Sequence, residues 1–546
     1  MSAGEEKPSK NIDALKPDSQ PLQSLTLLQS LTKDSLMVLH RFTKIGTALS
    51  AERKIDSLME MIAVEAKELT NADGATLYIM SPEKTELQFA IVQTDSLNIR
   101  MGGKGGQITW PPIPLKNPEG LPNHSHVCAH VALTKKTVNI EDVYEYEGFN
   151  FQGTKSFDHN TGYRSQSMLV VPMKNYEDDV IGILQLLNAH DERKVFAFSP
   201  VSVEIAESFA SQAAVALSNS FLVQEIETLL ESFIRAIAFT IDEKSHYTGG
   251  HVRRVAEMTM KIAHKINEQQ EGPFSDVNFS DDELKELQIS AWLHDVGKIT
   301  TPEYIIDKAT KLQNIYDRID LIKIRFELYK LNALLSKFAQ DRVLESEDSH
   351  EKEELEKSLC DEFNFLFNVN KGTAFVSEEA LSRIRQIAMR KFEIEGEMQP
   401  LLLPEEIEEL SIRQGTLTPD ERNIIQKHAE MTCRILSQLP FPEKMKHVAQ
   451  YASSHHESLN GKGYPQGLTA ERIPLQARII ALADVFDALM ASDRPYKKAK
   501  TLFESMDIME KMAQELYTDP DIFELFKKES LYLEYDRGVI IDKIEL

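Results

Sequence analysis

The 546-residue chain contains only three cysteines and two tryptophans. Cys128, Cys360 and Cys433 are too scattered to form a zinc-ligand pattern or a disulfide framework. No uninterrupted apolar run approaches the roughly 20 residues needed to cross a bilayer, and the polar amino terminus lacks the apolar core of a secretory signal. We therefore expect a cytoplasmic protein without a membrane span.

Positive charge is also scarce, because 61 Lys and Arg face 86 Asp and Glu, giving a formal net charge of −25. Long nucleic acids are bound largely through neutralisation of their phosphates, so polymeric nucleic acid is not an expected partner. A small anionic ligand needs only a few local basic side chains. The 42% hydrophobic and 27% charged residues are typical of a folded globular protein, and the length predicts more than one core.

The amino-terminal half mixes helical and strand-like patterns. We expect a flexible tail over 1–34 and an α+β domain, an antiparallel sheet with flanking helices, over 35–215. The strand-like runs are 75–80, 168–173 and 180–186. An acidic turn signal at 176–179 separates the last two runs, and an amphipathic helix near 200–220 closes the domain.

A helical stretch without Pro or Gly runs from about 203 to 248. Its coiled-coil seam, with alternating four-residue and three-residue spacing, comprises Leu222, Ile226, Leu229, Phe233 and Ala236. One interpretation is a single amphipathic helix packed on its own domain. We favour a connecting signalling helix over 216–248 and a homodimer formed through 216–240.

After Gly249 the pattern becomes all-helical and predicts a helical bundle over 249–312 and 417–546, interrupted by a helical insertion over 313–416. Ser280 with Glu283 and Thr418 with Glu421 are the signatures of capping boxes, so each pair predicts a helix start. In the insertion, heptad spacing predicts a long helix that returns as a hairpin, and its members are Leu312, Ile315, Ile319, Ile322, Phe326 and Tyr329.

Histidines and aspartates of the bundle lie on apolar helix faces. His428 lies on the stripe of Ile424 and Met431, and Asp484 lies among alanines and isoleucines. One such histidine is usually a hydrogen-bonded core residue, but an unpaired buried carboxylate is costly and must be neutralised. Several of these residues on successive helices are better explained by divalent cations. In the adjacent pair His294-Asp295, the carboxylate can bridge two ions, whereas an imidazole cannot.

The bundle resembles the HD-GYP family of cyclic dinucleotide phosphodiesterases. The matching segments are 247–255, His294-Asp295-Val296-Gly297-Lys298, Lys427-His428, His455-His456-Glu457 through Gly463-Tyr464-Pro465, and 483–497. The resemblance implies a centre of two divalent ions, iron or manganese. It assigns the first ion to His251, His294, Asp295 and Asp484, and the second to His428, His455 and His456, with Asp295 as the bridge.

The resemblance also implies an activity and further site residues. The expected reaction is hydrolysis of cyclic di-GMP to linear pGpG, to GMP or to both, with Asp295 and Lys298 as catalytic residues. Lys298, Arg494 and Lys497 are candidates for binding substrate phosphates. Some family members bind a third metal through a glutamate at the position of Tyr247, so a phenol here favours two ions.

The sequence is also compatible with other substrates and with another class of function. Cyclic GMP-AMP is a rival substrate, and a non-catalytic nucleotide-binding scaffold is a rival from another class. A mononucleotide phosphohydrolase is disfavoured by the Gly463-Tyr464-Pro465 loop, for which contacts with cyclase domains are a family-level expectation.

Residues 35–215 resemble a GAF sensory domain. The resemblance depends on the order of elements and on the segment 157–169, followed by Val171-Pro172. It implies regulation of the bundle by a ligand of unknown identity, for which a cyclic nucleotide is one candidate. Phe157, Asp158 and Thr161 are the candidate ligand residues, although turn and strand-start roles explain them equally well.

Overall fold

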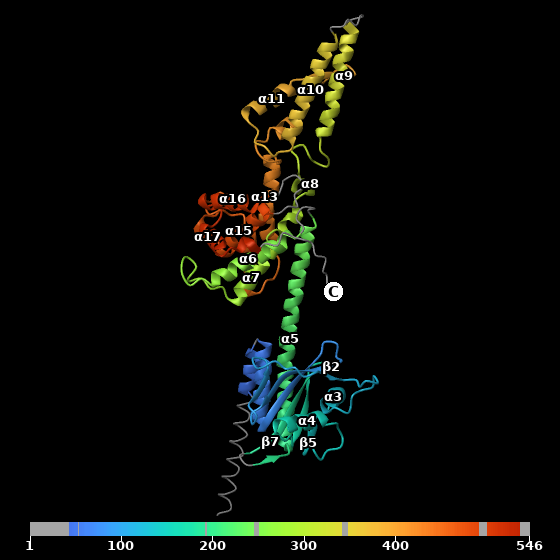
Figure 1. Ribbon diagram of the computed structural model, residues 1–546, viewed down its shortest axis with the longest axis vertical. Coiled ribbons are helices and arrows are strands. Elements are labelled where there is room, and N and C mark those ends of the chain that lie inside the picture. Colours follow the sequence, from blue (N-terminus) through green and yellow to red (C-terminus); the bar gives the residue numbers. More distant parts are fainter. Residues whose placement is uncertain are drawn as a thin grey trace, which may run out of the picture. The chain divides into compact units, whose positions relative to one another are not determined.

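A computed structural model describes residues 43–52, 54–191, 194–244, 250–340, 348–490 and 500–534. The chain divides into two compact units, Met1–Thr228 and Leu229–Leu546 (Figure 1). Every helix among the described residues is too short or too polar to span a lipid bilayer.

The first unit is built on an eight-stranded sheet in which the paired strands are antiparallel. The strands are β1 (Ala72–Met80), β2 (Glu86–Thr94), β3 (Ile99–Gly102), β4 (Ile113–Pro114), β5 (Val138–Ile140), β6 (Met168–Lys174), β7 (Val180–His190) and β8 (Val195–Phe196). Their order is β3-β2-β1-β7-β6-β5, with β4 beside β2 and β8 beside β7. The predicted turn lies between β6 and β7, where Lys174 pairs with Val180.

Helices cover both faces of this sheet. Successive residues of a strand point to opposite faces, so each strand contributes side chains to two cores. The helices of the unit include α2 (Ile55–Thr70), α3 (Val127–Thr134), α4 (Gln152–Thr161) and the first part of α5 (Pro200–Asp242), and residues 43–51 are also helical. On β6, Leu169 and Val171 join the core beneath α2 and α5, whereas Met168 and Val170 join the core beneath α3. The predicted α+β architecture is confirmed.

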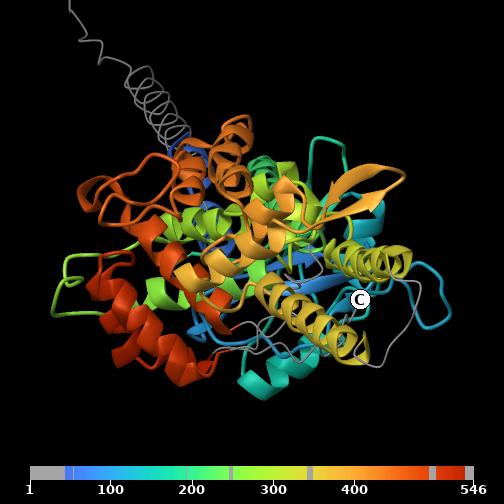
Figure 2. The ribbon, with the colours of Figure 1, turned by 90° about the horizontal axis from the view of Figure 1, so that it is seen from above.

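Among its described residues, the second unit is helical apart from one small hairpin. Its elements outside the insertion are the end of α5, α6 (His251–Asn267), α7 (Asp281–Leu293), η1 (Val296–Thr300), α8 (Glu303–Ile306), α13 (Pro419–Leu436), η2 (Glu443–Met445), α14 (Val448–Ser453), η3 (Ala470–Arg472), α15 (Leu475–Met490), α16 (Leu502–Gln514), α17 (Pro520–Lys528) and η4 (Leu531–Glu534). Helices α15, α16 and α17, red in Figure 2, pack against one another. Phe486, Phe523 and Phe526 are buried in the core that they share with α6 and α7.

Both predicted capping boxes are present. Ser280 caps α7 and Thr418 caps α13, and in each case the side chain accepts from the third helical residue, whose carboxylate accepts from the cap backbone. These caps fix where the two helices carrying candidate metal ligands begin. The connecting helix α5 ends at Asp242, and residues 245–248 of the predicted connecting helix lie outside the described residues.

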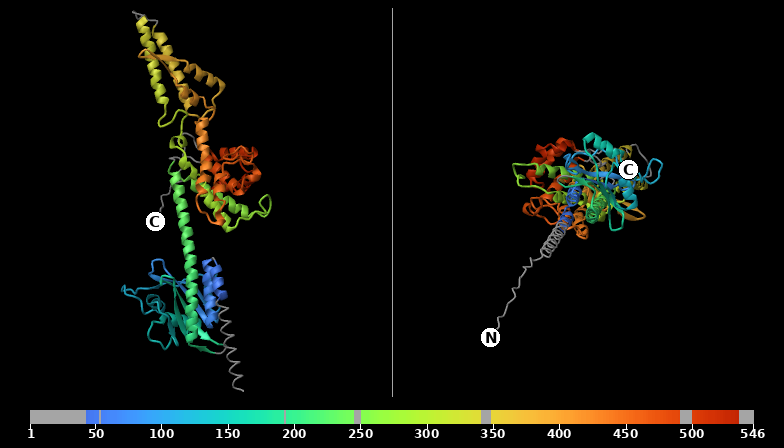
Figure 3. Two further views of the ribbon diagram at one scale, coloured as in Figure 1. Left: turned by 180° about the vertical axis from the view of Figure 1, so that it is seen from behind. Right: turned by 90° about the horizontal axis from the view of Figure 1, so that it is seen from below.

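The insertion has a core of its own. Its elements are α9 (Ile319–Gln340), α10 (Asp348–Asn370), α11 (Glu378–Ala388), β9 (Lys391–Ile394), β10 (Glu397–Pro400) and α12 (Pro404–Leu410). Helices α9 and α10 lie side by side, as predicted (Figure 1, Figure 3). Ile322 and Phe326 pack there with Leu359 and Leu366.

Two features of the insertion differ from the sequence pattern. The predicted seam includes Ile315, but this side chain is 91% exposed and α9 begins only at Ile319. Asp317 keeps the residues before Ile319 out of the helix. Its carboxylate accepts from Thr310 Oγ1 and Asn370 Nδ2, and these bonds hold the chain in a turn. The antiparallel hairpin of β9 and β10 was not predicted.

The two ends of the insertion lie next to each other in the structure. Thr416 Oγ1 donates to the Lys308 carbonyl at 3.0 Å. Lys311 is fully buried, and its Nζ donates to the carbonyls of Leu410 at 3.1 Å and Ile412 at 2.6 Å. A buried ammonium therefore ties the entry of the insertion to its exit.

Burial lowers the pKa of Lys311 to about 8. Between this value and the ordinary lysine pKa near 10.4, the unfolded chain binds more protons than the folded chain, so the free energy of unfolding rises with pH. We expect Lys311→Met to lack this rise, which can be measured by denaturant unfolding of both proteins from pH 7.5 to 10. Equal pH slopes in the two proteins would contradict the prediction.

Candidate metal centre

The candidate ligands come from five separate parts of the second unit. His251 begins α6, His294 and Asp295 follow α7, His428 lies in α13, His455 and His456 follow α14, and Asp484 lies in α15. The structure brings them together in two groups, within each of which the ligand atoms lie within 4.8 Å of one another. The groups are His251, His294 and Asp484, and Asp295, His428, His455 and His456.

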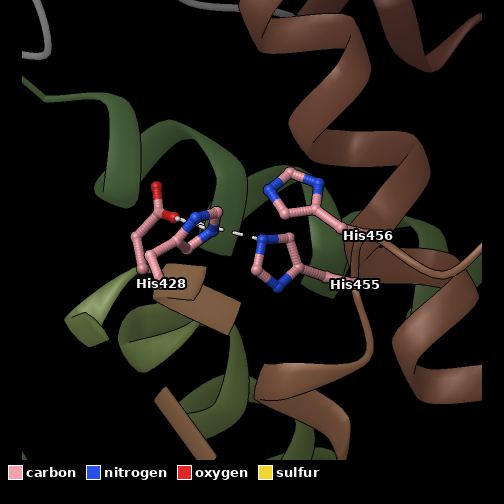
Figure 4. Close-up of side chains that lie close together, drawn as sticks. His428, His455 and His456 are labelled. Carbon is pink, nitrogen blue, oxygen red and sulfur yellow. Dashed lines mark ion pairs between the residues drawn. The ribbon is translucent and has the colours of Figure 1, made fainter. Parts of the chain in front are cut away.

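The Asp295 carboxylate stands between the two groups. Its Oδ2 lies 3.5 Å from His251 Nε2 and 3.2 Å from His294 Nε2. Its Oδ1 lies 3.4 Å from His428 Nε2 and 4.0 Å from His455 Nε2 (Figure 4). Each oxygen thus faces a different group, which is the arrangement that a carboxylate needs to be shared by two cations.

Three imidazoles are held in place by backbone carbonyls three residues earlier. The Nδ1 distances are 2.8 Å from His294 to Ala291 O, 2.6 Å from His428 to Ile425 O and 2.6 Å from His455 to Ala452 O. Because a carbonyl only accepts, each Nδ1 carries a proton, which leaves Nε2 as the nitrogen that can bind a metal in the neutral imidazole. The helix turns therefore fix the tautomer that binds a metal.

Four buried atoms of the centre have no hydrogen-bond partner: His294 Nε2, Asp295 Oδ1, His428 Nε2 and His455 Nε2. An unsatisfied buried polar atom costs about 1–3 kcal/mol, and four together at one point are unusual in a folded protein. Divalent cations would satisfy all of them. The mixed nitrogen and oxygen donor set suits iron or manganese but does not choose between them.

The protonation states differ between the two groups. Burial opposes protonation of His251 and His294, but Asp295 and Asp484 raise the pKa of both imidazoles, so a cation bound in the first group would replace a proton. The imidazoles of the second group are already neutral. Burial lowers the pKa of His428, burial together with His456 lowers that of His455, and burial lowers that of His456 to about 3. These imidazoles stay neutral, which is the form that binds metal. Burial opposes ionisation of Asp295, but Lys298 and His294 bring its pKa well below the usual range.

A close backbone contact brings the two groups together. Gly297, in η1, lies so close to α13 that a Cβ there would stand 2.0 Å from the His428 carbonyl oxygen. Thr432 Oγ1 accepts from Gly297 N at 3.0 Å and donates to the His294 carbonyl at 3.1 Å. Only glycine permits this approach, so position 297 helps to set the distance between Asp295 and His428.

The loop Gly463-Tyr464-Pro465 covers the second group. Glu457 is 3% exposed, and its two oxygens accept from Gln466 N at 2.7 Å and Leu468 N at 2.8 Å. A Cβ at Gly463 would stand 2.5 Å from the Glu457 Cα, so the loop folds directly onto this segment. The Tyr464 ring lies 4.7 Å from the His456 ring.

The candidate phosphate-binding residues differ in what can be said of them. Lys298 Nζ lies 2.5 Å from Asp295 Oδ2, and its side chain is 28% exposed. Lys298 therefore holds a positive charge at the rim of the centre. Arg494, Lys497 and Tyr247 lie outside the described residues.

Family models match most of the chain piece by piece. A GAF domain model matches residues 54–217, and two HD domain models match 248–387 and 380–522. The chain carries a GAF domain and an HD domain. The sequence resemblances that predicted these two domains are confirmed.

Curated relatives resemble this chain over short segments. A cyclic di-GMP phosphodiesterase of Thermotoga maritima is 41% identical over 117 residues, which are 21% of this chain and 31% of that protein. The 3′3′-cGAMP-specific phosphodiesterase 3 of Vibrio cholerae is 43% identical over 117 residues, or 21% and 24%. The cyclic di-GMP phosphodiesterase response regulator RpfG of Xanthomonas campestris pv. campestris is 46% identical over 93 residues, or 17% and 24%. Each match thus spans less than a third of the relative's length.

The sequence motifs did not single out two residues that support the HD domain's centre. His251 Nδ1 lies 2.7 Å from Asp487 Oδ2, and Arg254 Nε donates to Asp487 Oδ1 at 2.7 Å. This pair turns His251 Nε2 toward Asp295 and Asp484, the latter at 3.4 Å. Asp487 follows Asp484 by three residues and so shares its helix face, but this spacing does not show which of the two carboxylates binds a metal.

In the GAF domain, the candidate ligand residues all lie on α4. Asp158 is 2% exposed and accepts from Ser165 N, Ser165 Oγ and Tyr144 OH. Thr161 Oγ1 donates to the Phe157 carbonyl at 2.8 Å, and the Phe157 ring meets Trp110 edge-on. Asp158 thus has partners within its own domain, and a role in ligand binding stays a prediction for all three.

We expect Asp487→Asn to weaken metal binding roughly 10–100-fold, because it removes the charge that orients His251. Metal content after dialysis against a weak chelator measures the effect. Asp519→Asn is the matched control, since Asp519 is also a buried carboxylate that pairs with an arginine, Arg478, but lies outside the centre. Equal metal retention by the two variants would refute the orienting role.

Proposed function

We propose that this chain is a metal-dependent phosphodiesterase that hydrolyses a cyclic dinucleotide, with cyclic di-GMP as the leading substrate and linear pGpG, GMP or both as products. The observation that carries the proposal is the Asp295 carboxylate, whose oxygens face two separate groups of buried ligand atoms. The names of the curated relatives support the substrate class.

The proposed ligands divide as the two groups divide. His251, His294 and Asp484 would hold one divalent ion, His428, His455 and His456 the other, and Asp295 would bridge them. When bound, two such ions supply Lewis-acid catalysis of phosphodiester cleavage. The site of the first ion depends on Asp487, which orients His251, and that of the second on the carbonyls that orient His428 and His455.

Lys298 has a separate part in the proposed reaction. Its ammonium lies beside Asp295 and stays partly open to solvent, so it can turn to a non-bridging oxygen of the substrate phosphate. Phosphate carries delocalised negative charge, and a flexible lysine can follow that charge as it grows in the transition state. Arg494 and Lys497 remain proposed partners of the second phosphate.

The proposed metal ligands do not determine which nucleobases the substrate carries. One relative is named as a cyclic di-GMP enzyme and another as specific for 3′3′-cGAMP, so cyclic GMP-AMP remains the second candidate substrate. A non-catalytic scaffold would not need two groups of correctly oriented Nε2 atoms. The complete ligand set therefore favours turnover.

The reaction is tested with reduced, metal-loaded full-length protein, incubated with cyclic di-GMP and with cyclic GMP-AMP, and the products are separated by chromatography. We expect hydrolysis of at least one substrate and two ions per chain. Asp295→Asn should lower kcat at least about 100-fold, because it weakens the bridge between the ions. Asp519→Asn serves as the folding control. No turnover of either substrate by metal-loaded protein would favour the scaffold, and three tightly bound ions would refute the two-metal centre.

We further propose a homodimer formed through α5 and regulated by the GAF domain. The seam residues predicted from the sequence are exposed, Leu222 to 44%, Ile226 to 63%, Leu229 to 57% and Phe233 to 59%. These exposures do not fit a helix that packs this stripe on its own domain. A coiled coil between two chains would cover the stripe.

Ile226→Glu should weaken the dimer, because each chain would place a carboxylate in an apolar seam at a cost of roughly 2–3 kcal/mol or more. We expect the dissociation constant to rise by at least about 100-fold, measured by analytical ultracentrifugation. Gln224→Glu adds a charge at an exposed position off the seam and should have little effect. Equal dissociation constants for the two variants would rule out this interface.

A further inference from the structure

The last turns of α5 pack against residues that flank the candidate ligands. Ile234 and Ile241 are 5% and 6% exposed, and they share a core with Leu293, Val296 and Ala452. Leu293 and Val296 enclose the His294-Asp295 pair in the sequence. The Ala452 carbonyl holds His455 Nδ1. The apolar face of α5 therefore shares one core with residues that support both ligand groups.

Asp242, the last residue of α5, contacts the start of α6. The N-cap of α6 is Gly250, which has no side chain to satisfy the first backbone N–H groups. Asp242 supplies the missing acceptor, with Oδ2 3.2 Å and Oδ1 3.4 Å from Val252 N. A carboxylate is favourable at a helix N-terminus, and this one accepts from the backbone of the residue that follows His251.

Lys244, two residues later, contacts the end of η1. Its Nζ donates to the carbonyls of Lys298 at 3.0 Å, Ile299 at 2.5 Å and Thr301 at 2.8 Å. These three bonds use all the hydrogens of an ammonium group. Because η1 begins directly after Asp295 and contains Lys298, the ammonium of Lys244 fixes the segment that carries both residues.

The two contacts enclose very little free space. The cavity lined by Asp242, Lys244, His251, Asp295 and Lys298 measures about 10 Å³, no more than a single water requires. A displacement of the end of α5 would therefore be passed to His251 on one side and to Asp295 on the other.

We propose that Asp242 and Lys244 form a clamp that positions the metal centre, and that α5 regulates the centre through this clamp. The proposal rests on the proposed function and names the residues through which a change in α5 would reach it. Lys244 is a positioning residue here, since it acts through η1 and touches no ligand atom. The simpler alternative is that Lys244 only anchors α5 to the second unit.

The test compares two lysines that tie α5 to the rest of the second unit. Lys244→Met removes the ammonium that holds η1. Lys285→Met removes the partner of Glu231, an ion pair of 3.1 Å between α7 and α5 that lies outside the clamp. We expect Lys244→Met to lower kcat at least tenfold with little change in KM, and to lose bound metal at least tenfold faster during dialysis against a chelator. Lys244→Arg, which still donates to carbonyls, should recover most of both losses.

Both variants are also compared by thermal unfolding, which reports the anchoring of α5. If Lys244→Met changes kcat and metal loss no more than Lys285→Met does, the positioning role is wrong and Lys244 is an anchor. Failure of the wild-type protein to hydrolyse a cyclic dinucleotide would overturn the proposed function, while the rate of metal loss would still decide the clamp.

Discussion

The arrangement of the second unit depends on neutralising two carboxylates in its interior, those of Asp295 and Asp484. Asp295 is 2% exposed, and Asp484 is largely enclosed beside it. Their neighbours His428, His455 and His456 cannot provide positive charge, because burial lowers the pKa of each imidazole. Burial opposes protonation of His251 and His294, but Asp295 and Asp484 raise the pKa of both, so these two imidazoles and Lys298 offset part of the negative charge. Divalent cations would offset the rest. The helix caps, the carbonyl anchors and the close approach at Gly297 all hold this costly arrangement together.

Part of this centre could be predicted from the sequence, because His428 and Asp484 interrupt apolar helix faces, whereas the full ligand set followed from the family resemblance. Both residues lie where a polar side chain is costly unless a hydrogen bond or a cation satisfies it. Asp487 was missed because two carboxylates one turn apart give the same pattern, and only the fold shows that one faces His251. Lys244 was missed for another reason, since its partners are backbone carbonyls, which have no sequence signature.

The fold was predictable where local rules decide it. The caps at Ser280 and Thr418 and the turn between β6 and β7 follow from short-range chemistry and are present. The heptad spacing failed at Ile315, where the hydrogen bonds of Asp317 to distant residues hold a turn instead of a helix. Tertiary contacts of this kind override periodicity, and a single sequence does not reveal them.

The joined ends of the insertion have a consequence for how the HD domain can vary. Loop-closure entropy depends only weakly on length, about 0.6 kcal/mol for each doubling of a flexible loop. Here the detour has its own core, and Lys308, Lys311 and Thr416 hold its two ends together. The helices that carry Asp295 and His428 therefore meet across a short gap, whatever the length of chain between them. A change in the length of the insertion would therefore cost little loop-closure entropy and would leave the spacing of the metal ligands unchanged.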